Sequence, residues 1–286
     1  MTGDAGAAVL VLTAAGGVSD AVAEAAGRAV GASPRRLAAN AVELPLAGAL
    51  PDGFAVLGCD ANLVPVAGRR KRMLIADMDS TIIGVECIDE LADFAGLKAE
   101  VAAITERAMR GEIDFEGALI ARVALLKGLP GADLERCYAE RVRLNPGARV
   151  LVRTMAALGA VTALVSGGFS FFTERVAAAA GFGHQQANTL LAARGRLTGE
   201  VGRPILGREA KLAALRRLAG EAGIAPDAVI AVGDGANDLD MVRAAGLGVA
   251  YHAKPALAEA AGARLDRSDL TALLALQGIP EAEWRD

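Results

Sequence analysis

The sequence predicts an α/β protein, with a Rossmann-like parallel sheet core, a helical cap insertion and a small N-terminal α+β module. Apolar runs alternate with helical segments from residue 73 onward, which is typical of a parallel sheet covered by helices. Residues 85–144 interrupt this alternation with helical periodicity alone. Residues 1–68 precede the first core strand and predict a separate module, which leaves 69–286 for the core and its cap.

The N-terminal module is predicted to combine strands with one helix. Residues 7–13 form an apolar run typical of a strand, and residues 19–30 have helical periodicity with Ser19 as the N-cap. Residues 37–46 predict a second strand and residues 54–57 a third. We identify no chemical motif in this module.

The predicted core has strands that end in polar residues. Strands are expected at residues 73–77, 161–165, 229–232 and 247–251. Helices are expected at residues 147–158 and 208–219. Another helix is expected to begin at residue 170, and a further one to follow residues 233–238 and end at residue 245. Ligands of parallel sheets bind outside the carboxyl ends of the strands. We therefore expect the polar residues that follow these strands to converge on one site.

The predicted cap consists of helices only. They are expected at residues 88–94, 101–109, 115–126 and 134–142. An all-helical insertion directly after the first core strand is typical of a lid, which excludes water from a site and contributes specificity.

Composition excludes several classes of function. The chain has 286 residues, of which 53% are hydrophobic, enough for a sizeable core. Its net charge of -4 argues against a general nucleic-acid binder. No apolar stretch reaches the roughly 18 residues of a membrane span, and no Lys or Arg precedes the short N-terminal apolar run. Three cysteines without metal-type spacing indicate a reducing compartment, so we expect a cytoplasmic protein with neither nucleic-acid nor membrane partners.

The most informative segment runs from Met73 to Thr81. Its apolar part ends at Asp77, and Asp79 follows two positions later, so both carboxylates should project the same way from a buried strand end. A divalent cation would relieve the repulsion between them, while one acid attacks phosphorus and the other manages a proton. A calcium EF-hand loop does not fit, because Ile82 stands where that loop needs glycine.

Three further segments carry groups suited to phosphate or metal. Ser166, Gly167 and Gly168 follow a strand and offer a hydroxyl and backbone N–H groups to a phosphate. Lys211, near the start of a helical segment, would clamp a phosphate. Residues 233–238, Gly-Asp-Gly-Ala-Asn-Asp, form a half-site suited to magnesium. Taken singly, the glycines also fit an ordinary turn, and the lysine also fits a solvated helix surface.

Glu86 and Arg122 indicate a substrate-binding role only when they are considered together. Glu86 follows the first core strand and Arg122 lies in the predicted cap, where each alone is typical of a surface charge. With a substrate that carries an ammonium and a carboxylate, Glu86 would pair with the first. Arg122 would bind the second through a fork of two N–H groups that lysine cannot copy.

In combination these segments resemble the haloacid dehalogenase superfamily of phosphatases. The order Asp-x-Asp-x-Thr, Ser, Lys and Gly-Asp-Gly-x-Asn-Asp matches its four motifs over about residues 73–270. More narrowly, the chain is similar to the phosphoserine phosphatase family. The matching segments are residues 77–81, Glu86, residues 114–116 with Arg122, and residues 165–168, 233–238 and 248–255.

The resemblance implies a role for each matched residue. Asp77 would be the nucleophile, and Asp79 the general acid and base. Mg²⁺ would be held by Asp77, the backbone carbonyl of Asp79, and Asp234. The substrate and its phosphate would be bound by Glu86, Met109, Phe115, Arg122, Ser166, Gly167, Lys211 and Asn237.

The function implied by the resemblance is the Mg²⁺-dependent hydrolysis of O-phospho-L-serine to L-serine and phosphate, the last step of serine biosynthesis, through an aspartyl phosphate. Three alternatives stay open: transfer of the phosphoryl group to another alcohol, hydrolysis of another small phosphate ester, and amino-acid binding without catalysis. Residues 1–68 loosely resemble the ACT-like regulatory domains of bacterial members. A small-molecule substrate is the expected partner, and a homodimer is left open.

Overall fold

The computed structural model of the chain describes residues 8–46, 50–51, 54–109 and 112–286, and the side chain of Met109 falls outside this description. The strands are β1 (Ala8–Thr13), β2 (Arg35–Ala38), β3 (Ala41–Leu46), β4 (Asp60–Pro65), β5 (Met73–Ala76), β6 (Val161–Phe169), β7 (His184–Asn188), β8 (Leu190–Ala193), β9 (Arg196–Val201), β10 (Val229–Gly233), β11 (Leu247–Tyr251) and β12 (Ala263–Leu265). The helices are α1 (Asp20–Val30), α2 (Cys87–Phe94), α3 (Lys98–Met109), α4 (Phe115–Leu125), α5 (Gly131–Arg141), α6 (Ala148–Ala157), α7 (Ser170–Ala180), α8 (Arg208–Glu221), α9 (Leu239–Ala244), α10 (Pro255–Ala258) and α11 (Ala272–Leu276).

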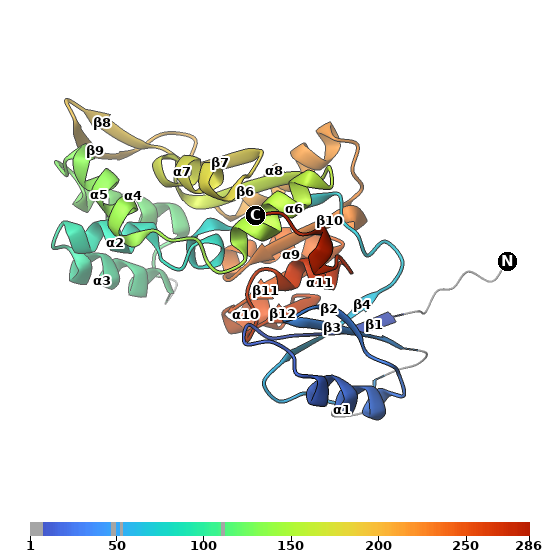
Figure 1. The fold of residues 1–286 in the computed structure, drawn as a ribbon. Helices are drawn as coiled ribbons and strands as arrows, with labels where there is room; N and C mark the ends of the chain where they lie inside the picture. Colours follow the sequence, from blue (N-terminus) through green and yellow to red (C-terminus); the bar gives the residue numbers. More distant parts are fainter. Residues whose placement is uncertain (1–7, 47–49, 52–53, 110–111) are drawn as a thin grey trace.

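A six-stranded parallel sheet in the order β12-β11-β10-β5-β6-β7 forms the centre of the molecule (Figure 1). Its inner strands are apolar on both faces because both faces are covered. In β5, for example, Met73 and Ile75 pack on one side while Leu74 and Ala76 pack on the other. Helices α8, α9 and α10 cover the first side, and α6, α7 and α11 cover the second. The predicted α/β fold class is confirmed.

Helices α2 to α5 occupy the stretch that the sequence predicts as a cap, between β5 and α6 (Figure 1). The hairpin β8–β9 joins them, and Gly128 and Leu129 of the cap exchange backbone hydrogen bonds with Leu197 of β9. We do not predict this hairpin from the sequence. Its strands are mostly exposed, with only Leu197 buried, so they lack the apolar alternation that marks a half-buried strand.

The N-terminal module is a four-stranded antiparallel sheet in the order β2-β3-β1-β4 with α1 on one face. Ser19 caps α1 as predicted, accepting a hydrogen bond from the N–H of Val22. Two strand predictions are wrong. Residues 37–46 form a hairpin instead of one strand, and residues 54–57 are not a strand. Phe54 packs toward the α1 layer from a loop, so its apolar character reflects burial without strand pairing.

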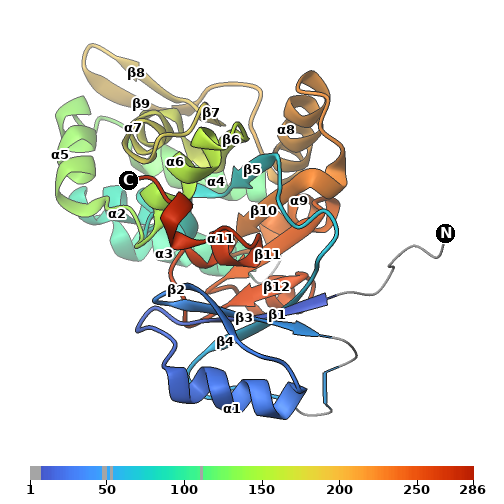
Figure 2. The same ribbon diagram turned by 45° about the vertical axis from the view of Figure 1, so that its right-hand side comes forward.

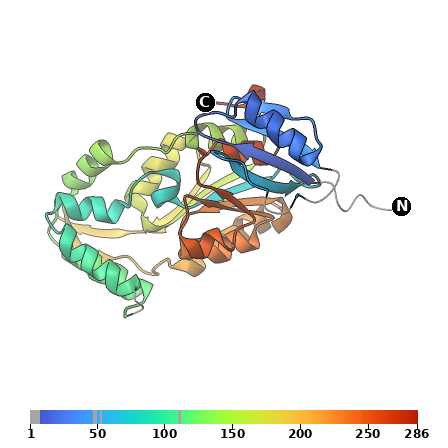
Figure 3. The ribbon, with the colours of Figure 1, turned by 90° about the horizontal axis from the view of Figure 1, so that it is seen from below.

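The sheet of this module packs against the core with the face opposite α1 (Figure 2). The side chain of Asn62 in β4 exchanges two hydrogen bonds with the backbone of Arg264, at the edge strand β12 of the core sheet. Arg69, in the connection to the core, donates to Glu43 and to backbone carbonyls of Ala275 and Leu276 in α11. The module and the cap lie on different sides of the core (Figure 3). Whether residues 1–68 form a separable, ACT-like domain stays a prediction.

In the described part of the chain, none of the helices combines the length and the apolar character needed to cross a membrane.

Candidate active site

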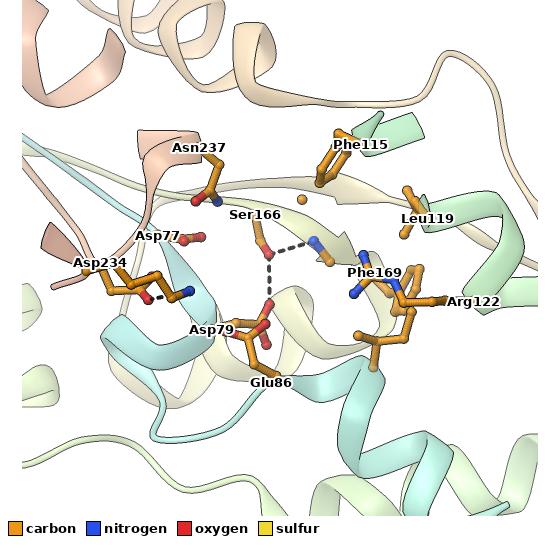
Figure 4. Close-up of a pocket in the computed structure, with 14 residues that line it drawn as sticks. Asp77, Asp79, Glu86, Phe115, Leu119, Arg122, Ser166, Phe169, Asp234 and Asn237 are labelled. Carbon is orange, nitrogen blue, oxygen red and sulfur yellow. Dashed lines mark hydrogen bonds and ion pairs between the residues drawn. The ribbon is translucent and has the colours of Figure 1, made fainter. Parts of the chain in front are cut away.

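The loop after β5 directs two carboxylates into one cavity. Asp77 and Asp79 both have extended backbones, and Ser80 then turns the chain with a φ of 55°. This left-handed conformation is uncommon for a residue with a side chain. Asp77 and Asp79 therefore face the same cavity, as their spacing predicts (Figure 4).

Asp79 is held by donors from the cap and from β6. The backbone N–H of Cys87, at the start of α2, donates to Asp79 Oδ1 over 3.0 Å. The hydroxyl of Ser166 donates to Asp79 Oδ2 over 3.2 Å and accepts from the N–H of Gly168 over 2.8 Å. A Cβ on Gly168 would lie 2.8 Å from Asp79 Oδ2, so this position requires glycine. The predicted strand 161–165 extends through this segment to Phe169.

Lys211 lies behind Asp77 and does not line the cavity. Its Nζ is 2.7 Å from Asp77 Oδ1 and 2.6 Å from Asp238 Oδ1, and its side chain is buried. The other oxygen of Asp238 accepts the backbone N–H groups of Asp234 and Gly235. Asp238 therefore orders both the lysine and the turn after β10.

The buried carboxyl groups of Asp77 and Asp79 have raised pKa values. Burial, followed by the charge of Glu86, raises the pKa of Asp79 to about 6, although the N–H of Cys87 opposes this. Burial and then Asp238 raise the pKa of Asp77, and Lys211 opposes them. Burial alone would lower the pKa of Lys211, but Asp77 and Asp238 outweigh it and raise the value. The lysine is therefore a permanent cation, and Asp79 can exchange a proton near neutral pH.

Carboxylate oxygens of Asp77, Asp234 and Asp238 lie within 4.8 Å of one another. Clustered carboxylates suit a hard divalent cation such as Mg²⁺. Both oxygens of Asp238 are occupied, one by Lys211 and the other by two N–H groups, whereas the bonds to Asp77 use Oδ1 alone. Asp77 and Asp234 are therefore the two carboxylates better placed to hold a metal. These two belong to the predicted ligand set. The third predicted ligand, the backbone carbonyl of Asp79, is not part of this carboxylate cluster.

The cavity in front of these groups has a volume of about 130 Å³. Its lining residues are Asp77, Asp79, Glu86, Ile88, Phe115, Leu119, Arg122, Ser166, Gly167, Gly168, Phe169, Asp234, Asn237 and Lys254. The structure thus brings together all the predicted site residues except Lys211, which lies behind the cavity, and Met109, whose side chain lies outside the described part. Their individual roles stay predictions.

Arg122 and Asp234 lie toward opposite ends of this cavity (Figure 4). Arg122 comes from α4, and its Nε donates to the carbonyl of Ala118 over 3.3 Å. Burial lowers its pKa, against the opposing charges of Asp89 and Glu86. Glu86 accepts a hydrogen bond from the hydroxyl of Ser80. The cation of Arg122 and the anion of Glu86 therefore occupy separate positions in the cavity, an arrangement suited to a zwitterionic substrate.

Several residues that the structure places in or next to the site have no role predicted from the sequence. Lys254 follows β11, and its Nζ lies 3.5 Å from Asp234 Oδ2. Its position directly after a core strand is the signal that would have found it. Asp238 is the last residue of the segment 233–238, which the sequence predicts as a magnesium half-site, but no separate role is predicted for it. Ile88 and Leu119 are apolar cap residues whose orientation depends on tertiary packing.

The chain is similar to known proteins in sequence and in fold. The family model of the haloacid dehalogenase-like hydrolases matches residues 74–243. A phosphoserine phosphatase of Streptomyces coelicolor is 46% identical over 241 residues, which are 84% of this chain and 58% of that protein. The chain thus spans just over half of that relative's length.

Two solved structures are also similar. A probable phosphoserine phosphatase of Vibrio cholerae has a TM-score of 0.82 and 32% identity, covering 96% of this chain and 88% of that one. A phospho-aspartyl intermediate analogue of a phosphoserine phosphatase has a TM-score of 0.67 and 38% identity, covering 72% of this chain and 98% of that one. The first similarity includes the N-terminal module, while the second is limited to about the length of the core and cap.

Proposed function

This chain belongs to the haloacid dehalogenase-like hydrolases, and from that premise we propose that it hydrolyses O-phospho-L-serine to L-serine and phosphate. The observation that carries the proposal is the content of one small cavity. Asp77 and Asp79 line this cavity together with the hydroxyl of Ser166 and the backbone N–H groups that follow it. Glu86 and Arg122 line the same cavity and carry opposite charges. A phosphorylated amino acid needs all of these groups at once.

Asp77 is the nucleophile in this proposal. Lys211 and the end of β5 hold its carboxylate, so an oxygen is presented to phosphorus at a fixed position. Its attack breaks the bond between phosphorus and the serine oxygen and forms an aspartyl phosphate. The similar solved structure of a phospho-aspartyl intermediate analogue supports this step. Positioning of this kind accounts for much of the catalysis of phosphoryl transfer.

Asp79 is the general acid and then the general base in this proposal. Its raised pKa of about 6 lets the protonated carboxyl donate to the departing serine oxygen. The resulting carboxylate then takes a proton from the water that attacks the aspartyl phosphate. The bonds from Cys87 and Ser166 keep the carboxyl group at the same place through both steps.

Asp77 and Asp234 would hold Mg²⁺ together with the backbone carbonyl of Asp79. When bound, the ion offsets the repulsion between the carboxylates and the phosphate dianion. Ser166 and the N–H groups after it would bind the oxygens of the transferring group, where charge spreads in the transition state. Asn237 lines the same end of the cavity.

The two ends of the serine moiety would be recognised by charge. Glu86 pairs with the ammonium, and Arg122 binds the carboxylate through two N–H groups. Phe115 and Leu119 of the cap line the cavity and would cover the Cβ side of the substrate. The reaction would be the last step of serine biosynthesis in the cytoplasm.

The test is a coupled measurement of both products. Purified protein with O-phospho-L-serine and Mg²⁺ should release serine and inorganic phosphate in equal amounts, and chelation with EDTA should stop both. An aryl phosphate serves as the control substrate, since it needs the phosphoryl site but neither Glu86 nor Arg122. Serine without phosphate would show transfer to another alcohol, and neither product from folded protein would refute the proposal.

A further inference from the structure

A second cavity, of about 790 Å³, opens directly beside the active-site cavity, and we call it the outer cavity. Glu86, Asp234 and Lys254 line both cavities, so the two adjoin at these residues. The lining of the outer cavity also includes Ala15, Tyr251, Asp266, Arg267, Ser268 and Asp269. The outer cavity is therefore formed by the loop after β5, the loops after β11 and β12, and the N-terminal module.

The wall of the outer cavity at residues 266–268 is held in place by the N-terminal module. Asp60 of β4 accepts the backbone N–H groups of Asp266 and Arg267, each over 3.0 Å, and the hydroxyl of Ser268 over 2.6 Å. The N–H of Ala15 donates to the carbonyl of Arg267 over 2.8 Å. Because Asp60 is buried, this wall is ordered before any ligand arrives.

The outer cavity carries charges of both signs. Carboxylates come from Glu86, Asp234, Asp266 and Asp269, and cations from Lys254 and Arg267. Tyr251, at the base, is buried. Such a mixed polar surface matches a short peptide, with its ammonium and its amide groups, better than it matches an apolar or polyanionic ligand.

Glu86 stands at the junction where the proposed substrate places its amino group. A substituent on that nitrogen would pass from the small cavity into the outer cavity. The carboxylate end has no such route into the outer cavity, because Arg122 lines the small cavity and does not line the outer one. The two ends of phosphoserine are therefore not equivalent in this structure.

We infer that this enzyme also hydrolyses phosphoserine whose amino group carries an aminoacyl residue, with the added residue seated in the outer cavity. The inference rests on the proposed function. The reaction is unchanged: the phosphorus–oxygen bond of serine breaks, water supplies the hydroxyl that completes inorganic phosphate, and the dipeptide leaves intact. The amide N–H replaces the ammonium at Glu86, so an ionic hydrogen bond becomes a neutral one.

The experiment compares kcat/KM for three substrates: O-phospho-L-serine, glycyl-O-phospho-L-serine and O-phospho-L-seryl-glycine. The glycyl compound should be hydrolysed about tenfold to a hundredfold less efficiently than phosphoserine, the cost expected for losing a charged hydrogen bond. The seryl-glycine compound should stay at the rate of the uncatalysed control.

A variant assigns the effect to the outer cavity. Ala15→Trp places an indole in that cavity while keeping the backbone bond to Arg267. It should lower the ratio of glycyl-phosphoserine to phosphoserine hydrolysis by about tenfold or more. Leu57→Trp is the matched control, because Leu57 is 95% exposed on the same module and lies outside the cavity. Thermal unfolding of both variants verifies that they fold.

The outcomes separate this inference from the proposed function. Hydrolysis of phosphoserine without hydrolysis of the glycyl compound would overturn the inference alone. Equal hydrolysis of both extended compounds, or an unchanged ratio in folded Ala15→Trp, would also overturn it. Loss of all three activities, while an aryl phosphate is still cleaved, would refute the proposed function itself.

Discussion

The ammonium of Lys211 lies 2.7 Å from the carboxylate of Asp77, behind the active-site cavity and out of reach of solvent. The lysine therefore acts first on the nucleophile. It holds one carboxylate oxygen in place and leaves the other for phosphorus or metal. From the sequence we expect Lys211 to bind phosphate. In the structure it binds Asp77 and does not line the cavity, so any effect on phosphate would pass through Asp77.

Removing this buried cation should destabilise the protein. Lys211→Met would leave the carboxylates of Asp77 and Asp238 without their shared partner, and we expect the free energy of unfolding to fall by about 3–5 kcal/mol. Denaturant unfolding in EDTA measures the loss. Lys98→Met is the control, because Lys98 is 70% exposed and its ion pair with Asp93 spans 3.8 Å. Equal effects of the two changes would contradict the role given to Lys211.

Stability without metal should fall as pH rises from about 4 to about 6. Burial raises the pKa of Asp79 from 3.8 to about 6, so over this range the folded protein keeps a proton that the unfolded chain has released. The melting temperature in EDTA should therefore be higher at about pH 5.5 than at about pH 7.5. Asp79→Asn should reduce this difference, and an unchanged difference would exclude Asp79 as its source.

The stabilisation of the protein by Mg²⁺ should follow the opposite pH trend. A divalent cation binds the ionised carboxylates of Asp77 and Asp234, and its binding releases protons. The rise in melting temperature on adding Mg²⁺ should therefore be larger at about pH 7.5 than at about pH 5.5. Equal rises would indicate that the cation binds elsewhere on the protein.

Arg122→Lys should act on the substrate carboxylate only. Lysine keeps the charge and loses the planar fork, so kcat/KM for phosphoserine should fall roughly tenfold to a hundredfold. The rate with an aryl phosphate, which lacks that carboxylate, should change by less than about threefold. Proportional losses on both substrates would mean that Arg122 supports the cap and not the substrate.

Asp60→Ala should show that the N-terminal module is part of the stable core. It removes the acceptor of two backbone N–H groups and the Ser268 hydroxyl, and we expect a loss of about 3 kcal/mol in a single unfolding transition. Asp20→Ala is the control, because Asp20 is exposed on α1 and forms a surface ion pair with Arg36. Two separate transitions would instead support an independent module.

Much of the core could be predicted from the sequence, because its strands are apolar and end in polar residues. The segments at Asp77, Ser166 and residues 233–238 lie around one cavity, as expected for parallel strand ends. The cap helices likewise follow their apolar periodicity.

Other features could not be predicted, since they depend on contacts distant in sequence. The hairpin β8–β9 is stabilised by bonds to the cap, such as that between Gly128 and Leu197. No motif in the sequence marks Asp60, and its partner Ser268 lies 208 positions later in the chain. The position of Lys211 behind Asp77 likewise follows from packing of α8 on the sheet.

The most direct test of the account is to identify the residue that carries the phosphoryl group during turnover. The enzyme is quenched with acid while it hydrolyses O-phospho-L-serine in Mg²⁺, and its peptides are analysed by mass spectrometry. We expect one phosphoryl group, on Asp77, and none in the Asp77→Asn variant. A phosphoryl group on another residue, or turnover that continues in Asp77→Asn, would contradict it.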